Sequence, residues 1–360
     1  MSNRLFTKYS LKDVTLRNRI AVSPMCQYTS DDGMPNDWHL VHLGSRAVGG
    51  AGLVIVEATA VSPEGRISPG DSGIYTDQHV EPFAKINRFI KQQGAVPGIQ
   101  LAHAGRKASA SCPWDGDRHL ELDEGGWETI APSAVAFGGH LPKVPKAMTQ
   151  ADIQRVQQDF VSAAQRSLDA GFEWLQLHFA HGYLASEFYS PLANQRTDEY
   201  GGSFENRTRF LVETFSAVRA VWPERLPLTI RLSVTDWDDD GVTLDQSIAL
   251  TRQLREAGLD LIDVSHGFVT PDISQIPWGP GMLLPMAAQI RREANVPTTT
   301  SWNITNAVQA ETAIHNGQVD LVTIGRELLR DPYWPYRAAN ELGVEDSGGL
   351  LPIQYARAVT

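Results

Sequence analysis

The sequence predicts an α/β fold, a single (β/α)8 TIM barrel that spans residues 1–360. Short β-rich segments alternate with longer amphipathic segments along the whole chain, as in folds with a parallel sheet. Several β-rich segments, such as LVIVEA from Leu53, are apolar throughout, which indicates strands covered on both faces. A long doubly wound sheet is the alternative. No G-x-G-x-x-G motif opens an early helix, although dinucleotide-binding sheets of that kind usually have one.

The expected elements follow one another in a regular order. Strands are expected at residues 19–23, 53–58, 96–101, 174–178, 228–232, 261–265, 297–301 and 320–324. Helices are expected at residues 151–170, 205–221, 244–257, 285–294, 305–316 and 327–342, where apolar residues recur at helical spacing. Thr149 and Asp152 can cap the first of these helices, and Gly171 follows its end. The excursions at 103–148 and 179–204 follow strand carboxyl ends, where barrel enzymes build their sites.

Composition excludes several classes of protein. The chain has 31 Lys and Arg against 42 Asp and Glu, a formal net charge of −11, whereas nucleic-acid and anionic-membrane surfaces need a basic face. Its two cysteines, Cys26 and Cys112, cannot form a disulfide framework or a Cys-based zinc site. No apolar run approaches the roughly 18 residues of a membrane span, and the polar N-terminus lacks a signal-peptide core. We therefore expect a soluble, cytoplasmic protein.

Polar and aromatic residues gather at the ends of the predicted strands. Because these ends share one rim of a barrel, such a gathering predicts an active site. In chain order the residues are Pro24, Met25, Cys26 and Tyr28, then Ala58, Gln100, His178, His181, Tyr183, Arg231, Trp302, Gly325 and Arg326.

His178 and His181 permit three interpretations. They can be two ligands of a metal, which needs a third ligand such as Glu187. They can be two hydrogen-bonded core histidines. They can also be a pair of donors for an anionic or carbonyl oxygen, and Tyr183 favours this third interpretation because a phenol beside two imidazoles is suited to proton donation.

Cys26 and Arg231 each leave two interpretations open. A free cysteine is often a small buried apolar residue, but Cys26 stands at a strand end beside Tyr28. Arg231 lies within the apolar run LTIRLSV, and a buried arginine must be paired. Its partner is either a bound anionic ring or carboxylate, or an acid of the chain such as Glu57.

The ends of the seventh and eighth strands predict a phosphate site. Loops at these positions bind phosphate in many barrels, and Arg326 can add a charge-assisted hydrogen bond. The alternative is an arginine at a helix start that faces solvent. The residues alone thus predict a barrel enzyme with a phosphorylated ligand, and they leave that ligand unidentified.

Longer motifs resemble those of the Old Yellow Enzyme family. HGYL at 181–184, followed by FYSPLANQRTDEYGGS at 188–203, is similar to the family's signature. RNRI at 17–20 and PMCQY at 24–28 resemble its first strand, with the Cys and Tyr of the thermophilic-like bacterial subgroup that includes xenobiotic reductases. QLAHAGR at 100–106 and GRELLRDP at 325–332 match as well. The resemblance covers essentially the whole chain.

The resemblance implies one FMN-binding domain. Gln100 and Arg231 would address the pyrimidine edge of the flavin, and Cys26 would tune its reduction potential. The flavin ring would be lined by backbone around Pro24, Met25 and Ala58, and the phosphate would be bound by Trp302, Gly325 and Arg326.

The resemblance also implies an NADPH-dependent ene-reductase without a metal, acting as a homodimer or homotetramer. His178 and His181 would bind the carbonyl oxygen of enones or maleimides, or a nitro group. Tyr183 would protonate Cα after hydride reaches Cβ, Tyr28 would offer a second hydroxyl, and Trp302 would add bulk beside the substrate. Two rivals remain, a demethylating or isomerising flavin barrel and a flavin-binding sensor or electron store without alkene turnover.

Overall fold

Eight parallel strands close into a barrel in the computed structural model, which describes residues 3–355 and 358. The order around the barrel is β10-β11-β12-β3-β4-β5-β8-β9. The predicted TIM barrel is confirmed, and the doubly wound alternative is wrong. The barrel strands are β3 (Ile20–Val22), β4 (Leu53–Ala60), β5 (Val96–Ala102), β8 (Trp174–Phe179), β9 (Leu228–Ser233), β10 (Leu261–Ser265), β11 (Thr298–Thr300) and β12 (Leu321–Ile324).

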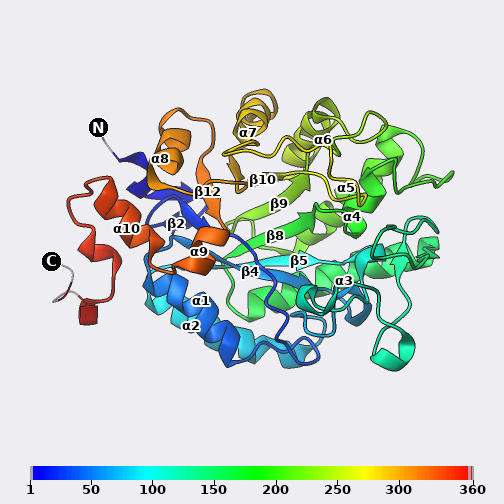
Figure 1. Cartoon of the computed structure of the whole chain (residues 1–360), viewed down its shortest axis with the longest axis horizontal. Coiled ribbons are helices and arrows are strands. Elements are labelled where there is room, and N and C mark those ends of the chain that lie inside the picture. The colour runs from blue at the N-terminus through cyan, green and yellow to red at the C-terminus, as the bar shows by residue number, and fades with distance from the viewer. Residues whose placement is uncertain (1–2, 356–357, 359–360) are drawn as a thin grey trace.

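Helices surround the barrel (Figure 1). They are α1 (Asp37–Val48), α2 (Val80–Gln92), α3 (Gln150–Asp169), α4 (Leu184–Tyr189), α5 (Phe204–Val221), α6 (Leu244–Glu256), α7 (Leu284–Ile290), α8 (Ala307–His315), α9 (Arg326–Arg330) and α10 (Trp334–Glu341). The predicted cap of α3 is confirmed, because the Thr149 side chain accepts a hydrogen bond from the Asp152 N–H. No helix in the described part of the chain combines the length and the apolar character that crossing a bilayer requires.

Two predicted helices need correction. The single helix expected at 327–342 is wrong, because Asp331 is extended (φ −145°, ψ 103°) and separates α9 from α10. The ring of Pro332 disfavours a helical conformation at the residue before it. The helix expected at 285–294 ends as α7 at Ile290 and continues as a π-helical turn, Arg291–Asn295.

The two excursions lie beyond the ends of β5 and β8. The first contains the short pair β6 (Ile130–Ala131) and β7 (Lys146–Ala147) and extends to the right in Figure 1. The second contains α4 and leads to α5. Away from the barrel, β1 (Tyr9–Leu11) and β2 (Val14–Leu16) form an N-terminal hairpin.

Strand register places polar side chains at matching levels inside the barrel. Gln100 on β5 is paired with Gln176 on β8. Two residues further along β8, His178 is paired with Arg231 on β9, and Arg231 with Asp263 on β10. All of these side chains are at most 5% exposed. Because alternate strand residues share a face, this register brings them together near the carboxyl end of the barrel.

Candidate active site

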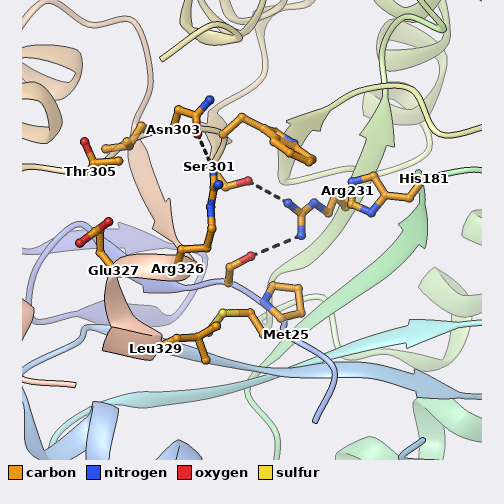
Figure 2. Close-up of a pocket in the computed structure, with 14 residues that line it drawn as sticks. Met25, His181, Arg231, Ser301, Asn303, Thr305, Arg326, Glu327 and Leu329 are labelled. Carbon is orange, nitrogen blue, oxygen red and sulfur yellow. Dashed lines mark hydrogen bonds between the residues drawn. The ribbon is translucent and has the colours of Figure 1, made fainter. Parts of the chain in front are cut away.

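A cavity of about 270 Å³ opens at the carboxyl ends of β3, β11 and β12 (Figure 2). Its lining includes Pro24, Met25, Arg231, Trp302, Gly325 and Arg326. The structure therefore brings together six residues that the sequence assigned to the flavin ring and phosphate. Arg326 is exposed, but its guanidinium bonds the Asn303 side chain and borders the cavity.

Arg231 is held on three sides at the base of this cavity. Its Nη2 donates to Ser301 Oγ at 2.8 Å and its Nη1 to Ser23 Oγ at 3.4 Å (Figure 2). Its Nε lies 3.4 Å from Asp263 Oδ2. Arg231 is thus paired with an acid of the chain, but that acid is Asp263 on the neighbouring strand and not Glu57, the example that the sequence offered.

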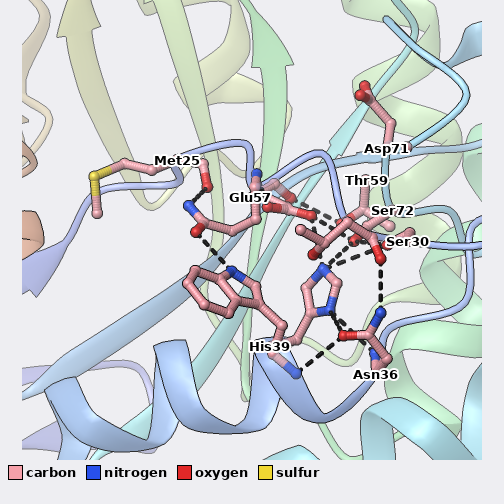
Figure 3. A network of polar contacts seen from close by, with 12 residues as sticks. Met25, Ser30, Asn36, His39, Glu57, Thr59, Asp71 and Ser72 are labelled. Atoms are coloured by element: carbon pink, nitrogen blue, oxygen red, sulfur yellow. Dashed lines mark hydrogen bonds and ion pairs between the residues drawn. The ribbon is translucent and has the colours of Figure 1, made fainter. Parts of the chain in front are cut away.

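Glu57 belongs to a different network, which fixes the loop after β3 (Figure 3). Its Oε2 accepts the Gln27 N–H at 2.5 Å, and its Oε1 accepts the Ser72 hydroxyl at 2.6 Å. His39 Nε2 lies 3.1 Å from the same Oε1. Because Gln27 follows Cys26 directly, this network fixes the backbone that carries the thiol.

Buried polar atoms at the barrel centre still lack hydrogen-bond partners. Within the described residues, Arg231 Nε and both carboxyl oxygens of Asp263 form no hydrogen bond. Burial, opposed by the Arg231 charge, raises the pKa of Asp263 to about 6. Gln100 Nε2 donates to Gln176 Oε1 at 2.6 Å. A fixed guanidinium beside an open cavity suits an anionic or carbonyl-rich ring.

His178 and His181 form a neutral pair next to this cavity. Their rings lie 5.0 Å apart at 90°. His178 Nδ1 accepts the Ala180 N–H at 3.3 Å, so the proton of that ring is on Nε2. His181 Nε2 lies 2.6 Å from Ser265 Oγ, to which Trp302 Nε1 also donates at 2.9 Å. Burial, and then the Arg231 charge, holds the pKa of both imidazoles well below the usual range.

The structure favours the donor-pair interpretation over the metal interpretation. Within the described residues, no three His, Cys, Asp or Glu side chains gather where they could hold a metal ion. Glu187, the acid that the metal interpretation offered as a third ligand, instead accepts the Arg106 N–H at 2.8 Å. Two neutral imidazoles with a free N–H are suited to an oxygen that gains negative charge.

Tyr183 stands against the histidine pair at the start of α4. Its ring lies 5.1 Å from that of His178 at 80°. Burial, and then the charges of Cys26 and Asp71, raises the pKa of the Tyr183 hydroxyl well above its ordinary value. The hydroxyl is therefore protonated at neutral pH and can donate a proton.

Lys107 is a site residue that sequence reasoning missed. Its Nζ donates to the carbonyl oxygens of His181 at 2.9 Å and Phe268 at 3.3 Å, and lies 5.1 Å from the centre of the Tyr183 ring. Burial lowers the pKa of Lys107 to about 8. The loop that carries His181 and the loop that carries Phe268 lie close together at Gly182 (φ +69°). Only glycine allows this contact, because a Cβ at position 182 would lie 2.0 Å from the Phe268 oxygen. The available signal was the RK pair at 106–107, which stands three residues after His103 and beyond the third predicted strand.

Tyr28, Tyr183 and Lys107 line a second cavity of about 330 Å³. Tyr28 has a left-handed backbone (φ 55°) and packs edge-on against Trp114 at 5.6 Å. Cys26 is partly exposed, and burial raises the pKa of its thiol, with Asp71 and Glu57 adding to the effect. Ala58 borders a smaller space behind Tyr183. The two predicted tyrosines thus share one cavity wall.

Comparison with known proteins agrees with this geometry. A sequence profile of the NADH:flavin oxidoreductase / NADH oxidase family matches residues 4–345. The chain belongs to this family. FMN is accordingly its cofactor, as the sequence predicted, and the chain is a flavin-dependent oxidoreductase.

Similar proteins extend the comparison. An NADPH dehydrogenase of Geobacillus thermodenitrificans is 47% identical over 99% of this chain and 99% of its own length. A solved Old Yellow Enzyme homologue from Zymomonas mobilis has a TM-score of 0.77 and 27% identity, over 94% of this chain and 92% of that one. A 2-naphthoyl-CoA reductase complex has a TM-score of 0.84 and 25% identity. That match covers 95% of this chain but 53% of the reductase, which is the longer protein. The predicted resemblance to the Old Yellow Enzyme family is confirmed.

Proposed function

We propose that the chain is an FMN-dependent ene-reductase that uses NADPH to reduce activated alkenes, namely enones, maleimides and nitro compounds. The observation that carries the proposal is the grouping of two neutral imidazoles with a protonated phenol. Two N–H donors suit a carbonyl or nitro oxygen that gains charge, and the phenol suits the neighbouring carbon, which takes a proton. The choice of NADPH is supported by the name of the Geobacillus relative.

The residues around the first cavity fit FMN. The Arg231 guanidinium and the Gln100 amide would bind the polar edge of its ring, and Arg326 would bind its phosphate. Pro24 and Met25 would line the ring. When bound, the flavin supplies the passage of a hydride from NADPH to Cβ of the alkene.

The chain's own side chains perform the remaining steps. His178 and His181 hold the substrate oxygen and stabilise the charge that develops on it. Tyr183 gives its hydroxyl proton to Cα. Tyr28, on the wall of the same cavity, offers a second hydroxyl to the substrate. Their pKa shifts keep all four groups uncharged at neutral pH, so that hydrogen-bond donors are in place before the reaction begins.

Anaerobic stopped-flow spectroscopy of the yellow holoprotein tests this proposal. NADPH should bleach the flavin, and cyclohexenone, a maleimide or a nitroalkene should restore its colour with one reduced product per flavin. A sensor or electron store would bleach without being recoloured by alkenes. Release of FAD instead of FMN on denaturation would contradict the cofactor assignment.

Ligand binding tests the histidine pair separately. A para-substituted phenol should give a long-wavelength charge-transfer band, because two N–H donors hold its phenolate above the flavin. The band should vanish in His178→Ala/His181→Ala while FMN stays bound, and persist in His315→Ala, which changes an exposed histidine of α8. A band that survives the double substitution would refute this role. Oligomeric state and cytoplasmic location stay predictions, and light scattering can measure the first.

A further inference from the structure

A small cavity of about 10 Å³ lies behind Tyr183. Asp71 and Tyr183 line it together with small or apolar residues, among them Ala58 and Ala102. Its volume is close to the minimum that holds one water molecule, and a water at such a place needs polar partners. The Asp71 carboxyl and the Tyr183 phenol are the titratable groups among its lining residues.

Asp71 is placed to exchange a proton. It is 3% exposed, and its carboxyl oxygens accept the Ile67 N–H and the Ser68 hydroxyl, both at 2.8 Å. In Figure 3 the carboxyl points away from the Glu57 network. Burial raises the pKa of Asp71 to about 7, against the lowering effect of its two hydrogen bonds. Near neutral pH this carboxyl is therefore present in both protonation states.

The titratable groups near Asp71 come from several elements. Glu57 on β4 raises the pKa of the Asp71 carboxyl by its charge. The charge of Asp71 in turn raises the pKa values of Cys26 and Tyr28 in the loop after β3, Cys112 in the first excursion, and Tyr183 at the start of α4. These thiols and phenols carry no charge while protonated, so the Glu57 charge is what adds to burial in favouring the protonated carboxyl of Asp71.

We propose that Asp71 is the proton source that restores Tyr183 after each turnover, through the cavity between them. The inference rests on the proposed function, in which the Tyr183 O–H bond breaks and its proton goes to substrate Cα. The Asp71 O–H bond then breaks, a water in the cavity passes the proton on, and the Tyr183 O–H bond forms again. The resulting Asp71 carboxylate then takes up a proton from water, and no atom changes its oxidation state.

Charge explains why such a source is needed. A phenolate on the partly exposed Tyr183 would be an anion close to the acidic groups that already raise the pKa of its hydroxyl. Removal of that charge must precede the next proton donation. Asp71 acts on the substrate only through Tyr183, so it is a positioning and proton-supply residue.

Asp71→Asn separates the first turnover from later ones. The amide can accept from the Ile67 N–H and donate to Ser68 Oγ, so both contacts survive while the acid is lost. Reoxidation of prereduced enzyme by cyclohexenone should keep its native rate in a single turnover, because Tyr183 begins protonated. Steady-state kcat should fall by about tenfold or more. Asp236→Asn is the matched control, because Asp236 is also buried with a pKa raised to about 6, and bonds Ser190 instead. It should retain both rates.

Infrared difference spectra give a readout without turnover. A protonated-carboxyl band that titrates near pH 7 should be present in the native holoprotein and missing from Asp71→Asn. If that variant fails to fold, Ser68→Ala keeps the acid and removes the hydrogen bond that lowers its pKa. The infrared band and the alkaline fall of kcat should then move together to higher pH, while the first turnover keeps its rate.

The contrary outcomes separate failure of the Asp71 relay from failure of the proposed function. An unchanged kcat in Asp71→Asn, a missing infrared band, or equal slowing of first and later turnovers would overturn the relay alone. A native protein that NADPH bleaches and no alkene recolours would overturn the proposed function, and the relay with it.

Discussion

Replacement of Tyr183 by Phe removes one hydroxyl and keeps the ring. The ring contacts with His178 and Lys107, both at 5.1 Å, do not depend on the oxygen. Within the described chain, no protein hydrogen bond ends on that hydroxyl. The free energy of unfolding should therefore change by less than about 1 kcal/mol.

The effect on catalysis should be large and confined to one half-reaction. Reoxidation by cyclohexenone should slow ~10²–10⁴-fold, the usual contribution of a positioned acid, which corresponds to about 2.7–5.4 kcal/mol at 1.36 kcal/mol per tenfold. Reduction by NADPH needs no proton at Cα and should keep its rate. Reoxidation by O₂ controls for damage to the flavin site.

Stopped-flow traces of the two half-reactions decide the outcome. Equal slowing of both would mean that Tyr183 positions ligands in general. An unchanged rate with cyclohexenone would refute the assignment and point to Tyr28 or water as the donor. Tyr28→Phe alone should lower the rate less, because the neighbouring acid remains.

Three further predictions concern the surroundings of the flavin and substrate. Cys26→Ser should remain folded and yellow with a shifted flavin reduction potential, because a thiol is more polarisable than a hydroxyl. An unchanged potential together with unchanged half-reaction rates would mean that Cys26 is only a packing residue. Lys107→Met removes a cation beside the Tyr183 ring and two carbonyl contacts, so enone reoxidation should slow about tenfold, with partial recovery in Lys107→Arg. Equal losses in both variants would argue against a role for the charge. Urea titrations should show that the free energy of unfolding falls as the pH is lowered below ~6.5. Each of His178 and His181 should contribute a fall of about 1.4 kcal/mol per pH unit. The reason is that acid protonates these imidazoles in the unfolded chain at a higher pH than in the folded chain. His178→Asn should show a shallower fall, and an identical slope would refute this origin.

The sequence was sufficient to predict the barrel and most of the site, because both depend on local pattern. Short β-rich runs identified all eight barrel strands, several of them apolar throughout. The residues at the carboxyl ends of these strands meet at one rim for any conformation of the loops. This is why the sequence assigned His181, Arg231 and Gly325 to one site, although they follow or belong to different strands and lie far apart in the chain. The cavity that joins them confirms the geometric rule.

Pairing between side chains was harder to predict than their location. The sequence left the partner of Arg231 open between a bound anion and an acid of the chain, with Glu57 as the example. In the structure β9 adjoins β10, which brings Asp263 to Arg231, whereas β4 adjoins β3 and β5. Helices α1 and α2 were also missed, and the break between α9 and α10 depends on one proline.

Burial of individual polar side chains was the property least predictable from the sequence, and the chemistry of this site depends on it. Asp71, Asp263 and Glu187 are ordinary acids in sequence, yet burial raises their pKa values to about 7, 6 and 8. Asp71 lies after β4, beyond any strand end, and becomes a proton donor only because the surrounding loops exclude water from it. The same exclusion keeps His178 neutral and Tyr183 protonated. Strand ends therefore locate the reacting groups, and the loops that cover them set their protonation states.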